Sequence, residues 1–220
     1  MVSKNTPADL LADYLHCRLK HLDASNSRIE EYMSVEGMTL CRKIDEGVYT
    51  ANSPAVARIV KHLEYVVGNT FRNTMLVGVC SFLEEAIKAI AKLLIDDDDD
   101  YEKKLKSLKG GNWLSKHIEL LVNNVGLTVD VSLTSELDKF HQFITLRNCV
   151  VHSFGKVSGD RNPTAVLGAV NVLMAIDNGT VEVTKDGFLL FGDQLVPEAI
   201  ITAENIGDAI LGVTTGASMT

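Results

Sequence analysis

Apolar residues recur along most of the chain at spacings of three and four positions. This periodicity predicts amphipathic helices over residues 7–32, 54–95, 113–125, 134–154, 165–177 and 197–211. A helix over 54–95 would be unusually long, so we expect a break or kink near Gly68 and Asn69. The second half of that segment is apolar almost all round, and we expect it to be the central and most buried helix.

Local signals predict where these helices begin and end. Thr6 is suited to cap the first helix, and Thr134 is suited to cap the helix over 134–154. Residues 33–53 contain glycine, asparagine and serine and predict a loop with one short helical piece. The run Asp96–Asp100 should end the second helical segment in a loop, because like charges repel and acidic groups oppose the dipole at a helix C-terminus. Gly155 suits a left-handed residue after the helix over 134–154.

One segment departs from the helical pattern. The short apolar runs TVEV and FLLF flank Asp186 and Gly187, a pair that strongly favours a tight turn, and they predict a β-hairpin. The expected fold is therefore all-α, a helical bundle with a small C-terminal β-hairpin. We expect one domain over residues 1–220, with its core at about 6–211 and a flexible tail at 212–220.

Composition narrows the class of protein. The chain has 220 residues, of which 46% are hydrophobic, enough to bury a core of its own. It has no uninterrupted apolar stretch of the roughly 18 residues that a membrane span needs. The N-terminal segment becomes amphipathic and acidic where a signal peptide would stay apolar, which predicts a cytoplasmic protein.

The acidity of the chain is partly local. The net charge is −8, and five of the negative charges form the run Asp96–Asp100, so the rest of the chain carries −3. Binding to nucleic acid depends on local cationic patches. The nearly balanced charge of the rest of the chain therefore does not exclude such binding. The densest cationic stretch, residues 103–116, is more readily a solvated face than a surface that follows phosphates.

The familiar signatures of cofactor and metal sites are missing. The four cysteines (17, 41, 80 and 149) have neither finger spacing nor a C-x-x-C pair, so zinc and disulfide frameworks are not expected. Cys80 and Cys149 lie in apolar helical sequence and should be buried. No phosphate-loop, dinucleotide, zincin or serine-hydrolase motif occurs, and we expect neither cofactor nor metal. Glu84 and Glu85 point about 100° apart on a helix, so they cannot flank one bond.

The segment LRNCVVHSFG places three polar residues near the end of an apolar helix. Asn148 and His152 share a face, and the long side chain of Arg147 can reach the same groove, with His141 close to that face further back. Buried arginine is rare unless it is paired. Three readings stay open: a structural network at the helix end, a ligand site, or RNA cleavage in which arginine holds a phosphate and histidine moves a proton.

The same segment resembles the R-x4-6-H motif of the HEPN superfamily. LRNCVVHSFGKV is similar to the motif helix of its RNase-like branches, including the RiboL-PSP-HEPN group, and SFLEEAIKAIAKLL is similar to the family's central helix. The hairpin TVEVTKDGFLLF, followed by a closing helix, also looks like the end of those members. The resemblance covers roughly residues 54–211.

This resemblance implies a metal-independent endoribonuclease that acts in a toxin or antiphage defence role. Arg147 would neutralise the scissile phosphate, His152 would transfer the proton for 2′-OH attack, and Asn148 would orient His152 or contact RNA. Such proteins commonly form a homodimer through the motif helix, and an antitoxin or defence partner protein is possible. Two alternatives remain: a non-catalytic HEPN module that binds a partner or nucleotide, and a structural helical protein whose Arg147 is neutralised by an internal carboxylate.

Overall fold

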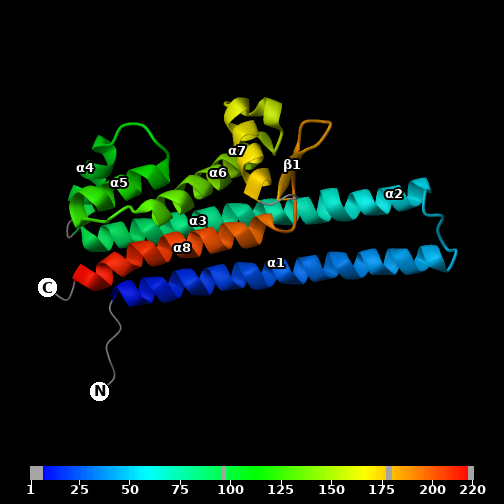
Figure 1. The fold of residues 1–220 in the computed structure, drawn as a ribbon, viewed down its shortest axis with the longest axis horizontal. Coiled ribbons are helices and arrows are strands. Elements are labelled where there is room, and N and C mark those ends of the chain that lie inside the picture. Colours follow the sequence, from blue (N-terminus) through cyan, green and yellow to red (C-terminus); the bar gives the residue numbers. More distant parts are fainter. Residues whose placement is uncertain (1–6, 96–97, 177–179, 218–220) are drawn as a thin grey trace, which may run out of the picture. The chain divides into compact units, whose positions relative to one another are not determined.

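The computed structural model describes residues 7–95, 98–176 and 180–217. Within them the regular secondary structure is helical except for one two-stranded antiparallel sheet near the C-terminus (Figure 1), which confirms the predicted all-α class with a small hairpin. The chain separates into two compact units, residues 1–20, 79–143 and 199–220, and residues 21–78 and 144–198. Four helices contribute to both units: α1 (Pro7–Asp45), α3 (Asn69–Leu94), α6 (Val131–Ser153) and α8 (Leu195–Ala217). The single domain stays a prediction.

The first unit also contains α4 (Asp98–Ser107) and α5 (Trp113–Val125). Helix α5 has the predicted bounds because the Asn112 side chain accepts a hydrogen bond from the Ser115 amide at 3.0 Å and Gly126 takes a left-handed conformation with φ 74°. The core of this unit consists of apolar side chains with at most 1% exposure, including Leu15, Leu83, Ile87, Leu114, Phe140 and Ile206.

Three predicted boundaries in the first unit are wrong. The acidic run was expected to form a loop, but its residues 98–100 begin α4. Negative charge at this N-terminal end interacts favourably with the helix dipole. Residues 96 and 97 lie outside the described part. Asp130, rather than Thr134, caps α6: its carboxylate accepts a hydrogen bond from the Leu133 amide at 2.8 Å. Helix α8 continues to Ala217, beyond the start of the expected tail.

The second unit is built on an antiparallel pair of helical segments (Figure 1). The later part of α1 lies beside α2 (Pro54–Lys61), the π-helical turn η1 (His62–Gly68) and the start of α3, and residues 46–53 connect them. The loop predicted over 33–53 is therefore too long, because α1 tolerates Gly37 and reaches Asp45, burying Leu40 on the way. The Thr6 cap falls outside the described residues.

The predicted break before Asn69 is confirmed as the π-helical turn. The Asn69 amide donates to the Glu64 carbonyl, five residues back, instead of the usual four. Gly68 packs against α1: a β-carbon at this position would lie 2.7 Å from Cε of Met33, and the end of that flexible side chain would have to move. The turn therefore fits an extra residue into the helix beside Met33 of α1.

The hairpin consists of β1 (Val181–Val183) and β2 (Leu189–Phe191), with Val181 opposite Phe191 and a turn at Gly187, φ 79°. Helix α7 (Pro163–Ile176) and the 3₁₀ turn η2 (Val157–Gly159) precede it. The hairpin also binds the backbone that follows α6. The Leu189 amide donates to the Gly155 carbonyl at 2.8 Å, and the Val157 amide donates to the Gly187 carbonyl at 2.9 Å. The hairpin thus fixes the end of α6, the helix that carries Arg147, Asn148 and His152 (called the motif helix below).

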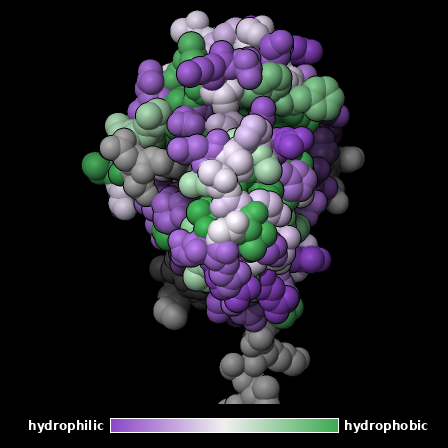
Figure 2. All heavy atoms as spheres, turned by 90° about the vertical axis from the view of Figure 1, so that its right-hand side faces the viewer, coloured by the Kyte–Doolittle hydropathy of each residue, from purple (hydrophilic) through white to green (hydrophobic). Residues whose placement is uncertain are grey.

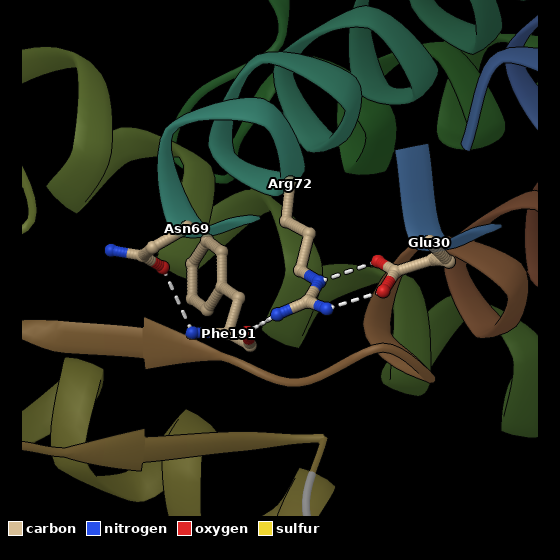
Figure 3. A network of polar contacts seen from close by, with 4 residues as sticks. All are labelled: Glu30, Asn69, Arg72 and Phe191. Atoms are coloured by element: carbon tan, nitrogen blue, oxygen red, sulfur yellow. Dashed lines mark hydrogen bonds and ion pairs between the residues drawn. The ribbon is translucent and has the colours of Figure 1, made fainter. Parts of the chain in front are cut away.

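An internal ion pair ties α1, α3 and β2 together (Figure 3). The guanidinium of Arg72 donates to the Glu30 carboxylate through Nε at 2.7 Å and Nη2 at 2.5 Å, and through Nη1 to the Phe191 carbonyl at 2.8 Å. Asn69 completes the network by accepting from the Phe191 amide at 2.9 Å. This arginine is 8% exposed, and each of its three side-chain nitrogens has an internal partner, which gives it a structural role.

The end of the second unit at which residues 46–53 connect α1 to α2 is mixed in character. Figure 2 looks onto this end and shows hydrophobic side chains in small groups among hydrophilic ones. Val48 and Met38 are exposed at 62% and 61%. Isolated apolar side chains of this kind are normal on a protein surface.

Candidate functional site

The predicted site residues lie in the last two turns of α6, within the second unit. The helix ends at Ser153, and the two residues that follow have positive φ: 51° at Phe154 and 75° at Gly155. Positive φ at Gly155 matches the prediction, whereas a phenylalanine in this conformation is strained. The Phe154 side chain is 88% exposed, so no buried contact accounts for its backbone conformation.

Arg147 is half-buried and has no acidic partner among the described residues. Its Nη1 donates to the Asn148 side-chain oxygen at 3.0 Å, while its Nε is buried without a hydrogen-bond partner. None of the ion pairs in the described part of the chain includes it. The internal carboxylate required by the structural alternative is therefore not found in this part of the chain, and the guanidinium is left uncompensated.

The contrast with Arg72 makes this feature specific. Both arginines come from long helices of the second unit. Arg72 is buried and has a carboxylate and a carbonyl as partners, whereas the half-buried Arg147 has one neutral amide. Withdrawing part of a guanidinium from water without an anion beside it is costly. An anionic group supplied from outside the chain would relieve that cost.

Asn148 contacts Arg147 in this structure. Its side-chain oxygen accepts the arginine hydrogen bond and so holds the guanidinium plane. A role of Asn148 toward His152 or RNA stays a prediction.

His152 is exposed, and no other described residue forms a hydrogen bond or ion pair with its ring. It lies five residues after Arg147 and one residue before the helix ends. An accessible imidazole can exchange a proton with a bound group. The ring of His152 is therefore accessible to a group from outside the chain.

His141 has a different environment from these three residues. It belongs to the first unit, where its Nε2 lies 3.0 Å from the hydroxyl oxygen of Ser115. Burial lowers the pKa of His141, and the nearby Asp138 carboxylate partly opposes that shift. The helical periodicity that suggested a shared face with the motif did not predict this contact, because Ser115 is distant in sequence.

A groove of about 1190 Å³ lies next to the end of the motif helix, between the α2–η1 segment and the hairpin. Phe154 lines it, together with the half-exposed rings of Tyr65 and Phe188. Its charged lining residues are Lys61, Glu64, Glu182, Lys185 and Asp186. Arg147, Asn148 and His152 are not among the lining residues. The groove could not be predicted from sequence, since it depends on how the hairpin folds back toward α2.

The remaining residues singled out in the sequence, two cysteines and two glutamates, do not form a further site in the described part of the chain. Cys80 and Cys149 are buried as predicted, and burial, with a smaller effect from Asp160, raises the pKa of Cys149 to about 11. Glu85 is exposed and Glu84 half-buried. Within the described residues, no group of three or more His, Cys, Asp or Glu side chains is arranged to hold a metal ion. No helix among these residues has the length and apolar character to cross a membrane.

Comparison with protein-family models, with curated proteins and with solved structures finds no match to this chain. The case for a function therefore rests on the residues themselves and on their geometry.

Proposed function

We propose that this protein is a metal-independent endoribonuclease of HEPN type, acting in the cytoplasm in a toxin or antiphage defence role. The observation that carries the proposal is the uncompensated guanidinium of Arg147, five residues before an exposed histidine at the end of α6. This pair has the composition and order of the R-x4-6-H motif that the sequence resembles.

The proposed reaction needs only these side chains and the RNA itself. Arg147, held by Asn148, neutralises the scissile phosphate. His152 takes the proton from the ribose 2′-OH, whose oxygen attacks phosphorus, and the 5′-oxygen leaves and takes up a proton. The products are a 2′,3′-cyclic phosphate end and a 5′-hydroxyl end, with no metal ion required.

The proposed homodimer would bring together two copies of the motif helix. Val151 and Phe154, on either side of His152 in sequence, are 43% and 88% exposed. Exposed apolar side chains beside a polar site favour a contact with a second surface. A two-fold contact through this helix end would double the number of cations around one RNA strand, which an acidic chain with no long basic stripe needs.

The experiment compares the wild type with His152→Ala and Arg147→Ala during induced expression in bacteria. We expect growth arrest and loss of RNA integrity with the wild type only. His62→Ala and Arg28→Ala, which change exposed residues of the same types elsewhere in the second unit, serve as matched controls and should behave as the wild type. Equal toxicity of the wild type and His152→Ala, or intact RNA in both, would remove the enzyme proposal.

A second candidate is a non-catalytic HEPN module that binds RNA, a nucleotide or a partner protein through the same residues. The observation that favours it is the lack of a hydrogen bond to the His152 ring from any described residue, since catalytic histidines are usually oriented by a neighbouring group. Purified protein that binds RNA in a manner dependent on Arg147, and yet leaves it intact, would support this candidate over the enzyme.

A further inference from the structure

A second polar constellation lies in the first unit, on the facing sides of α5 and α6. It borders a pocket of about 280 Å³. The pocket has an apolar wall and a small polar group, which is the usual composition of a small-molecule site. The apolar lining residues are Leu114, Ile118, Val129 and Leu137, and the polar ones are Ser115, Glu119, Thr134, Asp138 and His141.

Ser115 and His141 form a hydrogen-bonded pair at this pocket. The serine hydroxyl oxygen lies 3.0 Å from Nε2 of the histidine, and both side chains line the cavity. A hydroxyl within hydrogen-bond reach of an imidazole is the basic arrangement of an activated nucleophile. The two residues are 26 positions apart in sequence and lie in no serine-hydrolase motif.

The environment of the pair suits proton transfer at neutral pH. Burial lowers the pKa of His141 despite the Asp138 carboxylate, so the ring is largely neutral and one nitrogen can accept a proton. The Ser115 oxygen also lies 3.2 Å from the side-chain oxygen of Asn112, which caps the helix. The hydroxyl has one proton and two neighbours that can accept it: the Asn112 side-chain oxygen and, in the tautomer protonated at Nδ1, Nε2 of His141.

The position of Ser115 in the first turn of α5 adds electrostatic support. Its own amide donates to Asn112, while the amides of Trp113 and Leu114 precede the first intrahelical acceptor. The N-terminal end of a helix stabilises negative charge of the kind that forms when a hydroxyl attacks a carbonyl or phosphoryl centre.

We propose that Ser115 and His141 act as a nucleophile and its general base, and that the pocket accepts the short apolar acyl group of an ester. The Ser115 oxygen attacks the carbonyl carbon as its proton moves to Nε2 of His141, and the alcohol leaves with that proton. Water then hydrolyses the acyl-serine, releasing the carboxylic acid and restoring the hydroxyl. This site is independent of Arg147 and His152.

An alkyl fluorophosphonate tests the proposal on the full-length protein. The Ser115 oxygen would form a bond to phosphorus, fluoride would leave, and the serine proton would pass to His141. We expect mass spectrometry of the digested protein to locate the adduct on Ser115, at a rate at least tenfold above that of exposed Ser107 on α4. Labelling of Ser115 no faster than that of Ser107 would overturn the proposal.

Variants then test the role of the base. His141→Gln retains a polar side chain but cannot take up the proton, and it should reduce Ser115 labelling at least tenfold. Lys116→Ala, the neighbouring change on the same helix, should leave labelling unchanged. Unaltered labelling in His141→Gln would show that the histidine only packs against a capping serine. The mapping on the wild type decides the first question even if a variant fails to fold.

Discussion

The ion pair between Arg72 and Glu30 gives the sharpest prediction about stability. The perturbation is Arg72→Met, which keeps most of the side-chain volume and removes the guanidinium. It leaves the Glu30 carboxylate, whose side chain is 24% exposed, without its cation, and leaves the Phe191 carbonyl without its donor. Breaking a buried pair from one side costs about 3–5 kcal/mol. Because Glu30 keeps some contact with water, we expect about 3 kcal/mol, at the lower end of that range.

The double variant Arg72→Met/Glu30→Leu separates the loss of a partner from the loss of the pair. With both charges removed, only the Phe191 carbonyl is left unpaired, at a cost of about 1–3 kcal/mol. The double variant should therefore be at least as stable as Arg72→Met alone. Lys104→Met is the control: it breaks the exposed pair with Asp100, with side-chain exposures of 38% and 46%, and should cost less than about 1 kcal/mol.

The assay is urea unfolding followed by far-ultraviolet circular dichroism, with all four proteins compared at one pH and salt concentration. If Arg72→Met lies within about 1 kcal/mol of the wild type, or is no less stable than the control, then the network does not hold α1, α3 and β2 together.

Three further predictions concern single residues. Phe154→Gly should be more stable than Phe154→Ala by about 0.5–1 kcal/mol in the same assay, because φ at this position is 51° and glycine alone adopts it freely; the reverse order would contradict the strain. Burial, and to a lesser extent Glu102, raises the pKa of Tyr101 to about 12, so the stability that it contributes is complete below pH 10 and is lost as the pH rises toward 12. Tyr101→Phe should therefore flatten the fall in melting temperature between pH 10 and 12, and an unchanged slope would refute this. Ellman's reagent should react rapidly with the exposed Cys17 and Cys41 only, because Cys80 and Cys149 are buried and the pKa of Cys149 is raised to about 11. Rapid reaction of all four thiols would contradict the burial of Cys80 and Cys149.

Sequence periodicity predicted the parts of the fold that depend on local pattern. Helix α5, the hairpin at Gly187 and the break before Asn69 all follow from neighbouring residues, whose caps, turn and spacing agree with one another. The errors occurred where two local signals competed. Gly37 suggested a loop, but packing along α1 outweighed one glycine, and the acidic run suggested a loop although its last residues suit a helix N-terminus.

The candidate site could be predicted only in part, for a physical reason. Arg147, Asn148 and His152 are neighbours on one helix, so their proximity follows from helical geometry. Whether a carboxylate from elsewhere neutralises Arg147 depends on tertiary contacts, as does the pairing of Ser115 with His141. The uncompensated state of Arg147 and the groove beside Phe154 were therefore visible only once the chain was folded.

The measurement that tests the central claim most directly is the initial rate of cleavage of a labelled RNA by the purified protein in EDTA, with the product ends identified by mass spectrometry. We expect wild-type protein to yield 2′,3′-cyclic phosphate ends and His152→Ala to be slower by about 10²–10⁴-fold, the usual contribution of a general acid or base. Cleavage that EDTA abolishes, or equal rates for the wild type and His152→Ala, would contradict the account.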